Sequence, residues 1–189
     1  MNICLYGASS EKTAQTYIDA VEELGRKIGE RGHGLVFGGG ANGLMGAAAR
    51  GVLETGGAII GVVPHFLDRD GVLFQDCTEM ICTDTMRERK QIMEDRADGF
   101  VMTPGGIGTF EEFFEIFTLK QLGRHAKPIA VYNLCGYYDA LKALLDKAVS
   151  ENFLKKQSMD LFRLCGTAGE VLDYLEQSGG EKCEAPSFT

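Results

Sequence analysis

Charged side chains flank a glycine-rich segment in the middle of this sequence, and together they predict a site for a phosphate-bearing ligand. The segment PGGIGT spans residues 104–109, with Arg89 and Lys90 before it and Glu112 after it. Basic side chains and main-chain N–H groups bind phosphate, whereas a fixed carboxylate suits positive charge that develops during a reaction. The surrounding elements decide whether these groups meet.

The glycine-rich segment stands between a predicted strand and a predicted helix. Residues 99–102 are apolar and read as a buried strand, three glycines follow within four positions, and Thr109 opens an apolar helix. Glycine lets a ligand approach the main chain closely, and a helix start offers unpaired N–H groups and the positive end of the dipole. A plainer interpretation stays open, in which Thr109 and Glu112 only form a capping box and the glycines only form a turn.

The helix before this segment carries its positive charges at the unfavourable end. Residues 85–97 are predicted as a helix with a possible capping box of Thr85 and Glu88, yet three cations crowd its first turn and a half. The helix dipole opposes each such charge by about 0.3–1 kcal/mol. A solvated face with basic side chains lying over apolar ones is one explanation. Because this helix directly precedes the glycine-rich segment, a basic side chain that reaches a bound phosphate or sugar is the preferred explanation.

The helix that starts at Thr109 is expected to be covered on two sides. The phenylalanines at 110, 113, 114 and 117 are predicted to face the sheet, whereas Glu112, Ile116 and Leu119 form a second apolar strip headed by a carboxylate. Another part of the chain or a second subunit must cover that strip, so an internally sandwiched helix and a homodimer are both open. In either case Glu112 is expected in a partly enclosed space near the glycine-rich loop 103–109, which we call the phosphate loop.

Strands and helices alternate along the chain, and the strand runs are apolar on both faces. This pattern predicts an α/β fold, a Rossmann-like parallel sheet with helices on both faces. We expect a single domain over residues 1–177 and a loose tail over 178–189. The predicted strands are residues 2–6, 34–37, 58–63, 79–82, 99–102, 128–133 and 161–165. The predicted helices are residues 14–31, 44–55, 85–97, 109–122, 137–152 and 168–177.

Three small-residue loops, 7–10, 38–46 and 103–109, are expected at the carboxyl edge of this sheet, where ligands of such folds bind. The second loop contains GGGANG, which matches the G-x-G-x-x-G pattern of dinucleotide-binding proteins. That function needs an acidic residue at the end of the next strand, which here reads Val63-Pro64-His65. NAD or FAD binding is therefore disfavoured, and close packing of helix against strand remains the plainer role of these glycines.

Composition excludes several classes of protein. The 189 residues are 44% hydrophobic and 24% charged with a net charge of -8, which argues against a general nucleic-acid binder. No apolar run approaches the roughly 20 residues of a membrane span, and no basic leader precedes the first strand, so a cytoplasmic protein is expected. The six cysteines form no C-x-x-C pair and the three histidines lack metal-ligand spacing, which predicts a reduced protein with no metal site.

Three ordered motifs resemble those of the LONELY GUY family of cytokinin riboside 5'-monophosphate phosphoribohydrolases, whose members are often labelled lysine decarboxylases. PGGIGTFEE at 104–112 is similar to the family motif P-G-G-x-G-T-x-x-E, and MRERK at 86–90 is similar to M-H-E-R-K. GGGANGLMG at 38–46 is similar to the second glycine motif of the family. The likeness extends from Asn2 to about Leu175.

The resemblance implies hydrolysis of a purine nucleoside 5'-monophosphate to free base and ribose 5-phosphate, by a homodimer without metal or redox cofactor. It implies that Arg89 and Glu112 are catalytic: Glu112 stabilises an oxocarbenium-like state or deprotonates water, and Arg89 grips the phosphate or ribose. We further expect the irregular residues 65–77 to close over the base. The substrate-binding residues implied are Ser9, Gly40, Gly43, Met45, Gly46, Met86, Arg89, Lys90, Gly105, Gly106, Ile107, Gly108 and Thr109.

Departures from the family pattern leave the base open. Arg87 stands where many members have His, and Leu119 stands where they often have Trp, so AMP and a cytokinin nucleotide are both candidate substrates. A lysine decarboxylase would need pyridoxal phosphate on a lysine, and Lys90 is the one lysine in the constellation. A non-catalytic nucleotide sensor is a further alternative, although it has no need of Arg89 and Glu112.

Overall fold

The computed structural model describes residues 1–68 and 71–178, and its centre is a parallel sheet of seven strands. The strands are β1 Asn2–Tyr6, β2 Gly34–Phe37, β3 Ile59–Pro64, β4 Glu79–Thr83, β5 Gly99–Met102, β6 Ile129–Tyr132 and β7 Arg163–Cys165. The α-helices are α1 Gln15–Glu30, α2 Gly43–Glu54, α3 Met86–Arg96, α4 Ile107–Gln121, α5 Asp139–Ser150 and α6 Ala168–Ser178. Short 3-10 helices are His65–Leu67, Leu134–Gly136 and Lys156–Leu161.

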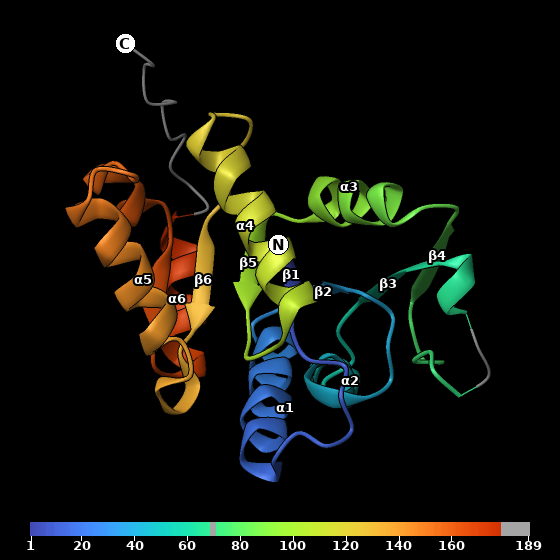
Figure 1. Cartoon of the computed structure of the whole chain (residues 1–189). Coiled ribbons are helices and arrows are strands. Elements are labelled where there is room, and N and C mark those ends of the chain that lie inside the picture. The colour runs from blue at the N-terminus through green and yellow to red at the C-terminus, as the bar shows by residue number, and fades with distance from the viewer. Residues whose placement is uncertain (69–70, 179–189) are drawn as a thin grey trace.

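The strand order is β4-β3-β2-β1-β5-β6-β7, and Figure 1 shows most of this succession across the molecule. The order reverses beside β1, which pairs with β2 on one side and with β5 on the other. Loops that follow β1 and β5 therefore diverge and leave a crevice between them, the usual ligand position in open α/β sheets. The phosphate loop predicted at 103–109 lies at this crevice.

Helices cover both faces of the sheet, as the apolar strands predicted. In β1, Ile3 and Leu5 pack against α1, α2 and α6, whereas Cys4 and Tyr6 pack against the side of α3, α4 and α5. Successive side chains of a strand point to opposite faces, so an apolar run with no polar alternation requires cover on both sides. Figure 1 shows α3 and α4 on neighbouring stretches of the sheet.

The helix that follows the phosphate loop differs from its prediction in two respects. α4 begins at Ile107 rather than Thr109. Its inward face contains Phe113, Ile116 and Phe117, while Phe114 is 36% exposed. Residues three and four apart share a helix face, so Ile116 belongs with Phe113 and Phe117 and not on an outer strip with Glu112, as the sequence had suggested.

The other predicted elements are found with their ends shifted by a few residues. The segment 65–77, predicted as irregular, contains the 3-10 helix His65–Leu67. Apart from Ser178, which ends α6, the predicted tail 178–189 lies outside the described residues. No helix in the described part of the chain is long and apolar enough to cross a membrane.

Candidate active site

A cavity of about 440 Å³ opens at the carboxyl edge of the sheet, beside β1 and β5. Its size lies within the range of small-molecule sites, roughly 300–1,000 Å³. Charged and main-chain groups from the starts of α3 and α4 face apolar side chains from the other wall. The lining residues are Gly7, Ala8, Ser9, Gly38, Gly40, Met45, Val63, Leu67, Val72, Leu73, Met86, Arg89, Gly106, Gly108, Thr109, Glu111 and Glu112.

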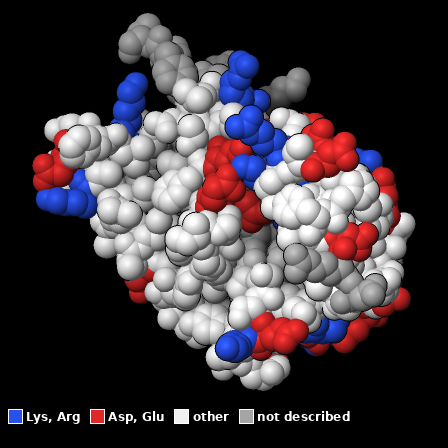
Figure 2. All heavy atoms as spheres, turned by 45° about the vertical axis from the view of Figure 1, so that its right-hand side comes forward, with Lys and Arg blue, Asp and Glu red and all other residues white. Residues whose placement is uncertain are grey.

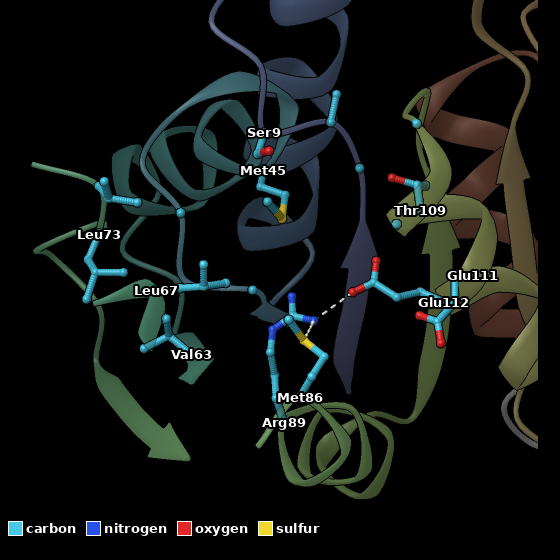
Figure 3. Close-up of a pocket in the computed structure, with 17 residues that line it drawn as sticks. Ser9, Met45, Val63, Leu67, Leu73, Met86, Arg89, Thr109, Glu111 and Glu112 are labelled. Carbon is cyan, nitrogen blue, oxygen red and sulfur yellow. Dashed lines mark hydrogen bonds and ion pairs between the residues drawn. The ribbon is translucent and has the colours of Figure 1, made fainter. Parts of the chain in front are cut away.

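Arg89 and Glu112 meet in this cavity, as the resemblance implied. Arg89 Nη1 donates to Glu112 Oε1 at 2.8 Å, and the two side chains are only 9% and 11% exposed. Figure 3 shows them pointing toward each other from α3 and α4. Arg89 is held further by Val62, whose carbonyl oxygen accepts from Nε at 3.2 Å. Its Nη2 has no acceptor among the described residues, so this nitrogen remains free for a ligand.

Burial controls the ionisation of Glu112. Desolvation raises the pKa of its carboxyl above the ordinary 4.5, while the neighbouring Arg89 guanidinium opposes that rise. A buried carboxylate near one arginine is poised for chemistry, because it has lost most of its water and keeps a single charged partner. Such a group can accept a proton from water or stabilise positive charge on a bound sugar.

The start of α4 presents free main-chain donors to the same cavity. Gly106 is the N-cap, no side chain caps the helix, and its first backbone bond runs from Phe110 N to Gly106 O at 3.0 Å. Across the described residues, the N–H groups of residues 106–109 have no protein acceptor. The alternative interpretation, a capping box of Thr109 and Glu112, is therefore wrong, because Gly106 is the N-cap and Glu112 binds Arg89.

The second glycine loop, at the start of α2, is used differently. Leu44 N and Met45 N both donate to the carbonyl oxygen of Ala8, at 2.8 and 3.4 Å. Gly43 has a φ of 62° and lies so close to Ala8 that a side chain there would collide. A Cβ on Gly46 would likewise collide with the main chain of Ala41. These glycines allow close packing, and the helix start that a dinucleotide phosphate would need is already occupied.

Gly38, the first glycine of this loop, makes room for Arg89. A Cβ there would overlap the Arg89 Nη2 atom. The end of β2 and the carbonyl oxygen of Val62 on β3 thus hold the Arg89 guanidinium in place. The need to accommodate Arg89 therefore explains the glycine at position 38 without a bound dinucleotide.

Two of the three cations at the start of α3, Arg89 and Lys90, are paired with acids on α4. The Lys90 ammonium binds Glu111, and its distance to Glu115 is 2.9 Å. In Figure 2, acidic atoms lie next to basic ones near the middle of the face that the picture displays. The predicted capping box of Thr85 and Glu88 is confirmed and holds the first turn of α3. Together these contacts offset the unfavourable helix dipole that the sequence revealed.

Apolar side chains form the wall opposite the glycine-rich start of α4. Val63, Leu67 and Leu73 lie on one side of the cavity, and Thr109 and Glu112 lie on the other (Figure 3). Leu67 and Leu73 belong to the segment 65–77, which was predicted to close over the base. The structure therefore brings this segment to the cavity as an apolar wall.

Most of the predicted site residues come together, and several do not. Those that line the cavity are Ser9, Gly40, Met45, Met86, Arg89, Gly106, Gly108, Thr109 and Glu112. Those that the structure does not place in the lining are Gly43, Gly46, Lys90, Gly105 and Ile107. Sequence reasoning missed Gly7, Ala8, Gly38, Val63, Leu67, Val72, Leu73 and Glu111 as lining residues. Most of them lie at the end of a strand, in the loop that follows it or in the segment 65–77, whereas Glu111, in the second turn of α4, has no such signal.

Comparison with known proteins identifies the family. A family model described as "possible lysine decarboxylase" matches residues 45–175. Cytokinin riboside 5'-monophosphate phosphoribohydrolase LOG2 from Arabidopsis thaliana is 38% identical over 175 residues, which cover 93% of this chain and 82% of LOG2. The rice (Oryza sativa subsp. japonica) phosphoribohydrolase LOG is 39% identical over 175 residues, covering 93% and 72% of the two chains. The chain belongs to the LONELY GUY (LOG) family.

Solved structures extend this LOG-family likeness to the fold. The molybdenum cofactor carrier protein from Chlamydomonas reinhardtii aligns with a TM-score of 0.71 and 21% identity, covering 95% of this chain and 98% of that one. The molybdenum cofactor binding protein from Rippkaea orientalis aligns with a TM-score of 0.65 and 17% identity, covering 93% and 94%. At these identities the likeness concerns the fold alone.

The lining of this LOG-family cavity does not fit the decarboxylase description of the family model. Pyridoxal phosphate needs a lysine for its Schiff base, and no lysine is among the described residues that line the cavity. Lys90 is bound to Glu111 and Glu115 instead. Arg87 and Leu119, where the sequence departs from the family, are also absent from that lining. Within residues 1–68 and 71–178, no three His, Cys, Asp or Glu side chains are grouped as metal ligands would be.

Proposed function

We propose that this protein hydrolyses the N-glycosidic bond of a purine nucleoside 5'-monophosphate to give free base and ribose 5-phosphate. One observation carries the proposal: the buried Arg89–Glu112 pair lies in the same cavity as the unpaired N–H groups that begin α4. A phosphate held by those N–H groups places the attached ribose between the helix start and the ion pair. The names of the relatives, which are phosphoribohydrolases of cytokinin riboside 5'-monophosphates, agree with this assignment.

Glu112 acts on the sugar in this mechanism. As the bond between C1' and the purine nitrogen breaks, its electron pair goes to the base and positive charge develops on the ribose. The Glu112 carboxylate stabilises that charge and accepts a proton from the water whose oxygen bonds to C1'. The departing base takes a proton from solvent. Because Glu112 is 11% exposed, few water molecules weaken its effect on the developing charge.

Arg89 orients both Glu112 and the nucleotide. Its Nη1 holds the carboxylate, and its free Nη2 is available for a ribose hydroxyl or a phosphate oxygen. A phosphate gripped at the α4 start, far from the bond that breaks, contributes binding energy that fixes the ribose for reaction. The main-chain N–H groups of residues 106–109 therefore bind the phosphate, and the Arg89 side chain binds a ribose hydroxyl or a phosphate oxygen.

The base lies against the apolar wall of Val63, Leu67 and Leu73 in this proposal. Such a wall accepts the flat face of adenine, and it also accepts an apolar group on the purine. AMP and an isopentenyl-substituted AMP are the two substrates to compare. Their relative kcat/KM values measure how much the wall gains from the extra apolar group, about 1.5–3 kcal/mol for a fully buried group of leucine size.

We further propose a homodimer that uses the outer face of α4. Ile107, Phe114 and Leu122 recur along that face and are 81%, 36% and 51% exposed. A second copy would cover this stripe beside the cavity, which differs from the strip of Glu112, Ile116 and Leu119 that the sequence predicted to be covered. The five cysteines of the described chain are all free, which fits a reduced, cytoplasmic protein. A single nucleotide-binding domain over residues 1–177 is part of the same proposal.

The test is release of free base from AMP and from isopentenyl-AMP by the wild-type protein and by Glu112→Gln. The wild type should release base, and Glu112→Gln should lose about 10²–10⁴-fold in kcat, the usual contribution of a positioned acid–base group. Glu115→Gln is the matched control, because it makes the same change on α4 outside the cavity, and it should keep wild-type activity. Equal rates in Glu112→Gln and the wild type would refute the assigned role of Glu112.

A nucleotide sensor without catalysis is the second candidate, supported by the same free donors at the start of α4. It predicts tight binding of AMP with no base released at any enzyme concentration. The buried ion pair favours hydrolysis, since binding a phosphate does not require a desolvated carboxylate.

A further inference from the structure

The phosphate loop shows an ordered arrangement of carbonyl groups behind the cavity. The carbonyl oxygens of residues 103, 104 and 105 each accept one hydrogen bond from outside the loop, two from the adjacent Tyr137 and Tyr138 and one from Ala8. Tyr138 Oη donates to Thr103 O at 2.7 Å, Ala8 N donates to Pro104 O at 3.1 Å, and Tyr137 Oη donates to Gly105 O at 2.7 Å.

This arrangement matters because a peptide group is planar. In a trans peptide the C=O and the following N–H point in opposite directions, so a bond that fixes the Gly105 oxygen also fixes the Gly106 N–H. That N–H is one of the free donors at the start of α4. Gly105 and Gly106 are adjacent glycines, the residue type with the greatest freedom to rotate. A reversed peptide would turn the Gly105 carbonyl toward the bound anion and repel it.

We propose that Tyr137 is a positioning residue for phosphate binding: its hydroxyl holds the Gly105–Gly106 peptide with the N–H toward the ligand. This inference rests on the proposed function, since it names a residue that prepares the same site. Tyr137 itself lies outside the cavity lining and acts through the main chain.

The segment after β6 presents this tyrosine in a defined position. Cys135 and Gly136 adopt positive φ values of 55° and 72°, which turn the chain sharply back. Tyr138 is 1% exposed and its N–H donates to Asn133 Oδ1 at 2.7 Å, so the following residue is fixed. The Tyr137 ring packs edge-on against Tyr138 and against Tyr17 of α1. The hydroxyl is therefore aimed at the loop by packing on both sides.

The experiment compares Tyr137→Phe with the wild type by calorimetric binding of ribose 5-phosphate and of adenine. Tyr137→Phe keeps the packed ring and removes only the hydroxyl. One lost hydrogen bond should weaken ribose 5-phosphate binding by about three- to tenfold and leave adenine binding unchanged, with at most a small fall in the melting temperature. Tyr17→Phe is the matched control, because it removes a hydroxyl from the neighbouring ring, and it should behave as wild type.

Several results would overturn the inference. Unchanged ribose 5-phosphate binding in Tyr137→Phe would show that the hydroxyl does not prepare the site. An equal loss for adenine and ribose 5-phosphate would show a general structural role. A wild-type protein that fails to bind ribose 5-phosphate would also overturn it. Because binding needs no turnover, a wild type that binds ribose 5-phosphate but releases no base would refute the proposed function and leave the role of Tyr137 intact.

Discussion

Two glycine-rich loops border the cavity, and they use their glycines in opposite ways. In the loop at 38–46, Gly43 and Gly46 admit neighbouring main chain so closely that a methyl group would collide. In the loop at 103–109, a Cβ on Gly106 or Gly108 would meet no heavy atom within 4 Å. The start of α2 is filled by the protein and the start of α4 is open, although a Cβ on Gly105, just before α4, would collide with Thr109.

The main-chain N–H groups at the starts of α2 and α4 differ in the same way. At the start of α2, Leu44 and Met45 give their N–H groups to Ala8, whereas the N–H groups at the start of α4 have no partner in the described chain. A glycine pattern in a sequence therefore predicts close approach of some group to the main chain, but not which group. In the first loop that group is protein, and in the second we propose that it is phosphate.

The largest expected effect is on stability, and it belongs to the filled loop. Gly46→Ala places a methyl group against the Ala41 carbonyl, which the main chain cannot avoid by rotating a side chain. We expect a loss of about 3 kcal/mol in the free energy of unfolding, at the upper end for overpacking, measured by urea denaturation. Gly169→Ala, whose nearest neighbour would be 3.9 Å away, is the control and should be as stable as the wild type or slightly more stable, since alanine is favoured over glycine in a helix. A Gly46→Ala protein of wild-type stability would remove the basis of the comparison.

Gly38→Ala should reduce catalysis, because its methyl group displaces Arg89 Nη2 from its seat. We expect kcat for base release to fall by about a hundredfold, equal to roughly 2.7 kcal/mol of transition-state stabilisation. The stability of the variant should change much less, since a guanidinium at the end of a flexible side chain can move away. If kcat remained at the wild-type value, Arg89 would not need this position for the reaction.

Gly108→Ala should weaken substrate binding without harming the fold. Its methyl group enters open space in the cavity lining, where the phosphate is proposed to bind. Alanine is also favoured over glycine in a helix by about 1 kcal/mol, so stability should hold or rise. We expect KM for AMP to increase about tenfold, roughly 1.4 kcal/mol, in steady-state kinetics. An unchanged KM would place the phosphate elsewhere.

The smallest effect is a pH dependence, which tests how far burial removes water from the Glu112 carboxyl. Burial raises the pKa of the Glu112 carboxyl above 4.5, so base release should decline as pH falls through a midpoint above that value. The sign for stability is the reverse. The folded state holds this proton more tightly than the unfolded chain, so the contribution of Glu112 is largest below pH 4.5 and is lost as pH rises through the folded pKa.

The direct measurement is the carboxyl ¹³C chemical shift of Glu112 followed against pH, assigned with Glu112→Gln. It avoids the second ionisation of the substrate phosphate, near pH 6, which overlaps in kinetic profiles. A midpoint at or below 4.5 would mean that Arg89 outweighs burial.

Much of the fold followed from the sequence because the strands are apolar on both faces and the helices alternate with them. The start of α4 was misplaced for a physical reason. Thr109 and Glu112 satisfy the spacing of a capping box, and only the tertiary contact between Glu112 and Arg89 shows that the carboxylate has a better partner. A local pattern cannot reveal that competition.

The charged groups of the site could be predicted from the sequence, but the residues that position them could not. Arg89 and Glu112 belong to motifs, so the resemblance located them. Gly38 and Tyr137 act through contacts with residues far away in the sequence, and neither spacing nor composition indicates which groups they touch. The resemblance also assigned Lys90 to nucleotide binding, yet Glu111 and Glu115 on α4 bind its ammonium, and Lys90 is not part of the cavity lining.

The central claim is that phosphate binds to the main chain at the start of α4 and not at the start of α2. The most direct test is to titrate ¹⁵N-labelled protein with ribose 5-phosphate and follow the amide signals. We predict large shifts for the N–H groups of Gly106, Gly108 and Thr109, with those of Leu44 and Met45 little changed. Large shifts at Leu44 and Met45 with none at the α4 start would contradict the account.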